Sequence, residues 1–406
     1  MLALFGGPPV RTRPFPAWPV FGTAEEERLL ETLRSGLWGR LDGRQVEEFE
    51  ARFAAMHGCR HGVAVVNGTV SLRIALLAAR IGAEDEVIVP PYTFLSTASA
   101  VVESNAVPVF ADIDPFTFNL DPEAVGAAIT PRTRAIIAVH FAGLPADMAA
   151  LQEIAAAHRL TLVEDAAHAH GASHRGRPVG SLGAMASFSF QSSKNLTSGE
   201  GGILVTSDDA LAAACRSIQN CGRVDGGLWY EHHVISGNYR LGEFQGAVLN
   251  CQLDRLEAQT AVRDANGAYL ADRLRSLPGV HPQRRTPDCT RHAYHLFMLR
   301  LDSAGFGAGR DAVVRALEAE GIPCSAGYGF SLPDQPLFRN KAFGPYLPGA
   351  RERLDYAAGR CPTSDLVCTQ SIWLEHSLLL GTREDMDDVV RAFEKIHSER
   401  GRLDEP

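Results

Sequence analysis

The chain has 406 residues, of which 45% are hydrophobic and 21% are charged, and its formal net charge at pH 7 is −9. This length allows a large buried core and predicts two domains, while the excess of acidic residues argues against nucleic acid or an anionic membrane as a partner. No apolar run is long enough to span a bilayer, and the opening residues MLALFGGPPVRTR lack the pattern of a secretory signal. We therefore expect a cytoplasmic protein.

The eight cysteines of the chain are scattered, and no two of them form a CxxC pair. In a reducing compartment such cysteines are buried small hydrophobic residues rather than a disulfide framework or a zinc site. We therefore expect no structural disulfides and no bound metal.

Two amphipathic helical patterns open the chain, at residues 24–35 and 43–58. Short apolar strands then alternate with helical segments, and this alternation is typical of βα units. The predicted strands are HGVAVV at 61–66, EVIVP at 86–90, VPVFADI at 107–113, RAIIAVH at 134–140, LTLVED at 160–165, MASFSF at 185–190 and GILVTS at 202–207. The pattern predicts an α/β fold with a mostly parallel seven-stranded sheet that is flanked by helices on both faces.

The pattern changes near Leu241 to a long helical stretch over residues 243–277, which we interpret as the link into a second domain. Beyond it we expect a strand at 293–302, a helix that ends in a glycine cap at 312–321 and a closing helix at 385–400. The sequence thus predicts a large α/β domain over residues 1–250, which includes the N-terminal helices, and a smaller C-terminal α+β domain over residues 251–406.

One lysine, Lys194, stands in the segment SFSFQSSKNLTSGEGG between a serine-bearing strand and a glycine-rich turn. Most lysines lie on the surface in water. Here the flanking residues are apolar or small and lack the charge pattern of a solvated face, which predicts a buried amine. Burial disfavours the ammonium form and lowers the pKa, as a lysine in Schiff-base chemistry with an aldehyde cofactor requires.

Asp165 ends the apolar strand TLVED upstream of this lysine. A carboxylate at such a place is the usual partner of the ring nitrogen of pyridoxal 5′-phosphate (PLP), where it keeps the ring protonated so that the ring acts as an electron sink. The two segments together predict a PLP site in which Lys194 and Asp165 are the catalytic residues.

Ordered motifs along nearly the whole chain resemble those of the DegT-type (DegT/StrS) sugar and cyclitol aminotransferases, which are fold type I PLP enzymes. They include VVNGTVSLRIALLAA, VIVPPYTFLSTASAVV, VPVFADIDPFTFNLDPEAV, SGNYRLGEFQGAVL and SIWLEHSLLLGTREDMDDVVRAFEKI. The resemblance implies a PLP-dependent aminotransferase with L-glutamine or L-glutamate as amino donor. It leaves the acceptor open, because the family acts on several substrates.

The phosphate of the cofactor is expected at the NGT turn, residues 67–69, which stands between a predicted strand and a predicted helix. Backbone N–H groups at a helix N-terminus favour an anion, although such a junction is more often a plain turn. The resemblance implies that Gly68 and Thr69 contact the phosphate and that Ser189 donates its hydroxyl. It also implies that Asn238 in SGNYRL completes the site of a neighbouring subunit, so we expect a homodimer with shared active sites.

Two further residues take cofactor roles by the same resemblance. Phe94 in PYTF falls where the family places an aromatic ring that stacks on the pyridine, although the residue by itself reads as a core phenylalanine. His168 lies three residues after Asp165, where the family has a Gln or His next to the phenolic oxygen of the cofactor. The alternatives for His168 are a hydrogen-bonded buried histidine or, as part of the motif HAH with His174 nearby, a metal cluster, and two histidines two residues apart are weak support for the latter.

The acceptor is assigned from finer likenesses. LWGRLDGRQVEEFE, FSFQ, NCGR and SIWLEHSLLLG look closer to enzymes that use glutamine with keto-inositols, or to 3-amino-5-hydroxybenzoate synthases, than to enzymes for nucleotide-linked keto-sugars. We therefore expect a keto-cyclitol acceptor in amino-sugar or aminocyclitol biosynthesis, with a nucleotide-linked keto-sugar as the alternative. A sugar dehydratase of the same fold would carry histidine in place of Lys194, and a non-catalytic binding protein would have lost one of Lys194, Asp165 and Ser189.

Overall fold

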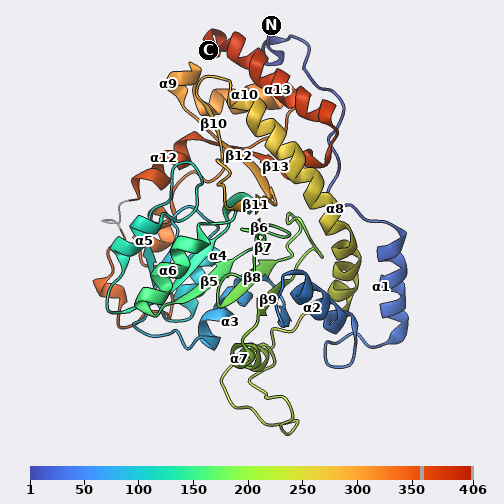
Figure 1. Cartoon of the computed structure of the whole chain (residues 1–406), viewed down its shortest axis with the longest axis vertical. Helices are drawn as coiled ribbons and strands as arrows, with labels where there is room; N and C mark the ends of the chain where they lie inside the picture. Colours follow the sequence, from blue (N-terminus) through green and yellow to red (C-terminus); the bar gives the residue numbers. More distant parts are fainter. Residues whose placement is uncertain (357–360, 404–406) are drawn as a thin grey trace.

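The computed structural model describes residues 1–356 and 361–403, and its centre is a seven-stranded sheet (Figure 1). The strands lie in the order β1-β9-β8-β5-β4-β2-β3, and every neighbouring pair is parallel except the two pairs that involve β9. Their bounds are β1 His61–Val65, β2 Glu86–Val89, β3 Val107–Phe110, β4 Thr133–Val139, β5 Thr161–Asp165, β8 Met185–Ser189 and β9 Gly202–Thr206. The mostly parallel sheet that the sequence pattern predicts is thereby confirmed.

Both faces of this sheet are buried, because successive side chains on a strand point to opposite faces and both kinds are apolar. On β5, Leu162 belongs to the core on one face and Val163 to the core on the other. The first core is closed by α2 Gln45–Met56, α5 Pro122–Ala128, α6 Met148–His158 and part of α8 Glu243–Leu274, and the second by α3 Gly68–Ala78, α4 Ser96–Glu103 and α7 Asp209–Gln219.

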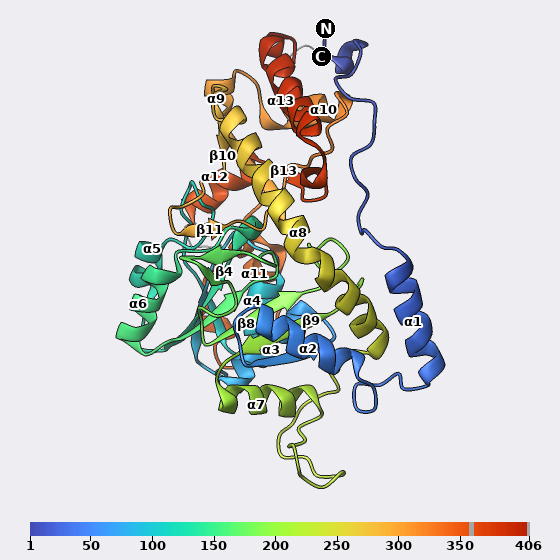
Figure 2. The ribbon, with the colours of Figure 1, turned by 45° about the vertical axis from the view of Figure 1, so that its right-hand side comes forward.

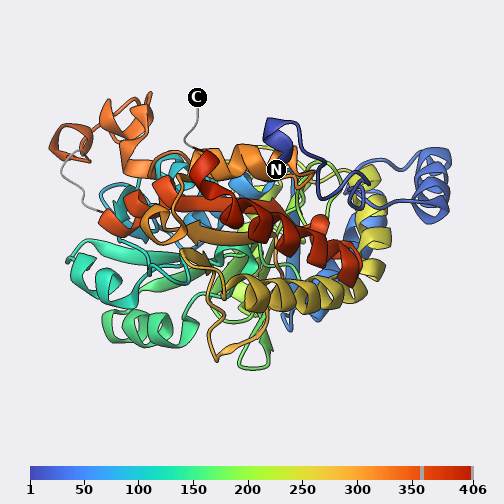
Figure 3. The ribbon, with the colours of Figure 1, turned by 90° about the horizontal axis from the view of Figure 1, so that it is seen from above.

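The C-terminal part has its own core around a three-stranded antiparallel sheet in the order β10-β12-β13. Its strands are β10 Val280–Pro282, β12 Leu296–Leu301 and β13 Ser371–Glu375, and its main helices are α10 Arg310–Ala319 and α13 Arg383–Ser398. Seen from above, α13 lies alongside α8 (Figure 3). The predicted strand at 293–302 begins three residues late, at Leu296, where the chain has left the bend at Tyr294, whose φ is 45°.

The large sheet and the C-terminal core are connected by segments that pack in both parts of the structure. Helix α8 runs without a break across residue 250 and packs in both cores. Leu2 is fully buried in the C-terminal core, and the chain then runs down to α1 Thr23–Ser35, as Figure 2 shows. In the other direction, Phe338 packs into a core of the large sheet. The division of the chain at residue 250 therefore stays a prediction.

The remaining elements are short. They are the strands β6 Ser173–His174, β7 Arg177–Pro178 and β11 Cys289–Arg291, which form a third sheet, the helices α9 Ser303–Phe306, α11 Pro336–Arg339 and α12 Pro362–Gln370, and the 3₁₀ turns Ala3–Phe5, Phe141–Gly143, Leu332–Asp334, Arg351–Arg353, Leu378–Leu380 and Arg400–Arg402. Among the residues that the structure describes, no helix combines the length and the apolar character that crossing a membrane requires.

Candidate active site

A cavity of about 760 Å³ opens at the carboxyl ends of β4, β5 and β8, the edge at which α/β sheets bind ligands. Its opposite wall comes from the C-terminal part of the chain, including residues of β12 and β13. The cavity brings together seven of the eight residues that the sequence predicts for the site, namely Gly68, Thr69, Phe94, Asp165, His168, Ser189 and Lys194. The local motifs therefore converge on one place in space.

The eighth residue, Asn238, does not line this cavity. It is exposed and forms an isolated bridge with Asn220 at the base of the connection between α7 and α8. This connection hangs below α7 in Figure 1, and its apolar side chains Leu228, Trp229 and Ile235 are exposed. The contribution of Asn238 to the site of a second subunit stays a prediction.

Lys194 stands on the loop between β8 and β9, in a tight turn that its own N–H closes onto the carbonyl of Gln191 at 2.9 Å. Burial lowers the pKa of its amine from 10.5 to about 8, against the attraction of Asp165, which works in the opposite direction. No described residue forms a hydrogen bond with this amine. Lys194 is also one of only three lysines in the chain, with Lys341 and Lys395.

Asp165 is held at both of its oxygens. The hydroxyl of Thr97 donates to Oδ2 across 2.7 Å, and the N–H of Ala167 donates to Oδ1 across 3.3 Å. Burial raises the pKa of this carboxyl, whereas these hydrogen bonds and the charge of Lys194 lower it. The carboxylate is thus fixed in place and relies on neighbours for its negative charge. Sequence reasoning missed Thr97, and its one signal was a hydroxyl in the first turn of the helix after PYTF.

The N-terminus of α3 forms a cradle with the end of β8. Asn67 caps the helix, because its side chain accepts the N–H of Val70 at 2.9 Å. A side chain at Gly68 would bring its Cβ within 2.8 Å of the Cβ of Ser189, so only glycine allows this approach. Thr69 and Ser96 share a hydrogen bond between their hydroxyls at 2.5 Å. Hydroxyls and free N–H groups at a helix N-terminus are suited to a phosphate.

Phe94 and His168 also face the cavity. Phe94 is 59% exposed, which is incompatible with a core residue and leaves an apolar ring open to the cavity. His168 is buried, and its Nδ1 accepts the N–H of Ala142 at 3.3 Å. Burial holds its pKa well below the usual range, so the ring is neutral and carries its proton on Nε2. His168 therefore offers one N–H donor.

Several residues that line the cavity are not among those that the sequence predicts for the site. They are Trp18 from the N-terminal segment and His295, Tyr328, Trp373 and His376 from the C-terminal part. The rings of His168 and His295 lie 4.2 Å apart, so the two parts of the chain meet directly beside the lysine loop. The sequence signals for His295 and His376 are the motifs HAYH and WLEH, and the residues of the lysine loop that these histidines contact lie a hundred or more positions earlier in the chain.

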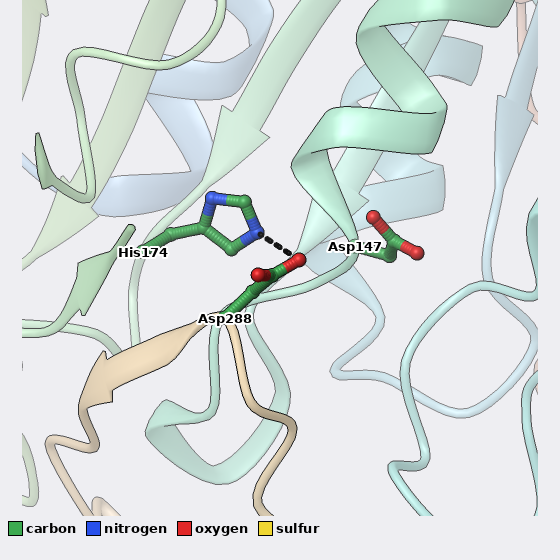
Figure 4. A group of neighbouring side chains, drawn as sticks. All are labelled: Asp147, His174 and Asp288. Atoms are coloured by element: carbon green, nitrogen blue, oxygen red, sulfur yellow. Dashed lines mark ion pairs between the residues drawn. The ribbon is translucent and has the colours of Figure 1, made fainter. Parts of the chain in front are cut away.

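The structure separates the histidines of the alternative metal cluster, His168 in the motif HAH and His174. His168 lines the cavity, whereas His174 points toward Asp288, with Asp147 beyond it (Figure 4). Each carboxylate of this group already has a structural partner, since Asp147 caps α6 and Asp288 binds Arg175 at 2.9 Å. The group gives no metal assignment, and the expected absence of a metal stays a prediction.

Comparison with known proteins agrees with the motifs. Residues 20–394 match the model of the DegT/DnrJ/EryC1/StrS aminotransferase family. The chain is 40% identical to 3-amino-5-hydroxybenzoate synthase of Amycolatopsis mediterranei, over 92% of this chain and 94% of the relative. It is also 40% identical to L-glutamine:2-deoxy-scyllo-inosose aminotransferase of Streptomyces kanamyceticus, over 99% and 98%.

Among solved structures, the crystal structure of 3-amino-5-hydroxybenzoic acid synthase superimposes with a TM-score of 0.86 at 37% identity and covers 96% of this chain and 100% of that one. The likeness in sequence and in fold extends over nearly the full length. The chain belongs to the DegT/DnrJ/EryC1/StrS family of aminotransferases.

Proposed function

We propose that this aminotransferase uses PLP to move the amino group of L-glutamine or L-glutamate to the ketone of a cyclitol. The observation that carries the proposal is the meeting of Lys194 and Asp165 in one cavity, with Lys194 as its sole lysine. The cavity residues fit the cofactor: they provide a partly deprotonated amine, a fixed carboxylate, a helix N-terminus with hydroxyls and an open aromatic ring. When bound, PLP supplies an electron sink.

Each residue of the site has a separate role in this reaction. The amine of Lys194 would take the proton from the α-carbon of the substrate, because a pKa of about 8 leaves part of the amine neutral at neutral pH. Asp165 would hold a proton on the pyridine nitrogen of the cofactor, and Thr97 keeps the carboxylate oriented. Phe94 would cover the cofactor ring, His168 would donate from Nε2 to the phenolic oxygen, and the α3 N-terminus with Ser189 would bind the phosphate.

A neutral keto-cyclitol suits the cavity better than a nucleotide-linked sugar. Among the described residues that line it, Lys194 is the only lysine or arginine, and a diphosphate needs cationic partners. Aromatic rings of Tyr328 and Trp373 face the cavity instead. The relative that acts on 2-deoxy-scyllo-inosose supports the cyclitol, and the 3-amino-5-hydroxybenzoate synthase supports the alternative. An assay panel that crosses glutamine and glutamate with keto-inositol and nucleotide keto-sugar acceptors decides between them.

We further propose that the enzyme acts as a homodimer with composite sites. Two facts support this assembly: Asn238 is exposed outside the cavity of its own chain, and the adjoining loop exposes Leu228, Trp229 and Ile235. Exposed apolar clusters of this kind mark protein interfaces. In such a dimer the amide of Asn238 would supply the partner's phosphate with a donor.

The first test concerns the covalent link. Lys194→Ala should abolish turnover and borohydride-stable attachment of PLP, because Lys341 and Lys395 do not line the cavity and Lys395 is already bound to Glu320. Mass spectrometry of the reduced and digested protein measures the attachment. Cofactor on another lysine together with retained activity would contradict the assignment.

The second test measures the acidity of the amine itself. Because burial lowers the pKa of Lys194, its acetylation by acetic anhydride in the cofactor-free protein should rise with pH around a midpoint near 8. Lys341 in the same digest controls for reagent exposure. A midpoint close to 10.5, the ordinary value for lysine, would show that the amine is solvated.

The third test concerns the orientation of Asp165. Thr97→Val removes the hydroxyl that donates to Oδ2 and should slow the loss of the cofactor's visible absorbance on mixing with L-glutamine by about tenfold. Thr93→Val is the matched control, since the Thr93 hydroxyl bonds to Thr97 and not to Asp165. Equal rates for Thr97→Val and the wild type would remove Thr97 from the mechanism.

The fourth test concerns shared sites. Lys194→Ala and Asn238→Asp should each be inactive, the latter because it places a negative charge against the phosphate. In a mixed dimer one of the two sites has both intact residues, so the mixture should recover activity toward half that of the wild type per dimer. Verified mixed dimers without activity, or a fully active monomer, would return Asn238 to a structural role.

A further inference from the structure

Arg263 is a buried charge with no hydrogen-bond or ion-pair partner among the residues that the structure describes. It lies in the middle of α8 with an exposed fraction of 0%. All three guanidinium nitrogens are buried, and none of them has a hydrogen-bond partner among the described residues. Burial lowers its pKa to about 9, so the group is still charged at neutral pH. A buried guanidinium without a hydrogen bond or ion pair is costly, and charged groups with perturbed pKa values cluster at functional sites.

The position of Arg263 is directly behind one wall of the cavity. Its guanidinium carbon lies 5.2 Å from the ring centre of Trp18. His376 packs edge-on against the same indole ring, with 4.6 Å between the ring centres, and Trp18 and His376 both line the cavity. The wall is anchored to the lysine loop, because Trp18 Nε1 and His376 Nε2 contact the carbonyls of Ser192 and Ser193 at 3.1 and 3.0 Å. The charge therefore stands behind a wall that contacts the lysine loop directly.

Among the described residues of this wall, none is a buried acid that could balance the charge. The imidazole of His376 donates from Nε2 to a carbonyl, and its buried Nδ1 has no partner among the residues described. Burial, together with Arg263 and Lys194, holds the pKa of His376 well below the usual range, so the ring is neutral. Glu375, the neighbouring acid, is exposed to solvent. Asp165 is committed to Thr97 and Ala167.

We propose that Arg263 supplies the positive charge that holds the α-carboxylate of the amino donor at the Trp18–His376 wall of the cavity. The inference rests on the proposed function, in which an amino acid must place its amine at Lys194 and therefore brings its carboxylate close to the lysine loop. Both L-glutamine and L-glutamate carry this carboxylate, whereas a keto-cyclitol carries none. Arg263 acts through the wall, without contact with the reacting atoms, and is a positioning residue.

If Arg263 has this role, its removal should leave the protein at least as stable and should weaken the binding of the amino donor. Arg263→Met keeps the length of the side chain and removes an unpaired buried charge, so it should match or exceed the wild type in Tm. It should weaken the binding of L-glutamine by about tenfold or more and leave the KM of the acceptor unchanged. Arg263→Lys keeps the charge and should restore most of the donor affinity.

Binding is measured without turnover in Lys194→Ala loaded with PLP, by titration of the visible spectrum. L-Glutaminol, which has the amine and carboxamide of L-glutamine but an alcohol in place of the carboxylate, is the matched probe, and its affinity should not respond to Arg263→Met. Arg255→Met is the control on the same helix, because Arg255 is paired with Glu25. It should lower Tm and leave the affinity for L-glutamine unchanged.

The results described next would contradict the role of Arg263. Equal affinity of Arg263→Met and the parent protein for L-glutamine, an equal loss for L-glutaminol, or a rise in the acceptor KM instead would exclude a donor carboxylate. An unfolded Arg263→Met protein would show that the guanidinium has a structural partner. A parent protein that binds neither L-glutamine nor L-glutamate would refute the proposed function itself, which distinguishes that failure from failure of the role of Arg263.

Discussion

The pairing of β5 with β8 is the constraint on which the site depends. Asp165 and Ser187 are register partners in adjacent parallel strands, so the carboxylate and the start of the lysine loop leave the sheet side by side. A slip of one residue would turn Asp165 to the opposite face and part it from Thr97. Lowering the pKa of Lys194 from 10.5 to about 8 reduces the stability of the folded protein by about 3 kcal/mol at neutral pH. The burial of apolar side chains in the cores offsets this cost.

The fold could be predicted from the sequence because its signals are local. An apolar run of five residues between helical segments is a buried strand in nearly any context, and alternation of strands and helices forces a parallel arrangement. The same holds for Lys194 and Asp165, since each is recognisable from its immediate neighbours. Gly68 and Ser189 come from separate motifs, and the structure brings them into contact at the end of the sheet.

The rest of the site could not be predicted, because its residues have no local signature. Thr97 reads as an ordinary helix residue until its hydroxyl is seen on Asp165. His295 and His376 reach the cavity only through the docking of the C-terminal sheet, and the sequence shows Arg263 as one more basic residue on a long helix. The roles of these residues depend on contacts between segments that are distant in the sequence, and local sequence patterns do not reveal such contacts. The role proposed for Asn238 is harder still to derive from local sequence patterns, because it depends on contacts with a second chain.

The tie between the two ends of the chain has a consequence for biosynthesis. The core that buries Leu2 is completed by α10 and α13, including Phe393, and these helices are synthesised hundreds of residues after Leu2. The start of the N-terminal segment that carries Trp18 therefore lacks the core around Leu2 until α10 and α13 have been made. The large sheet can fold while the chain is still growing, but the cavity wall can close only once Trp373 and His376 have been synthesised. Nascent chains would thus pass through a state with a formed lysine loop and an open site.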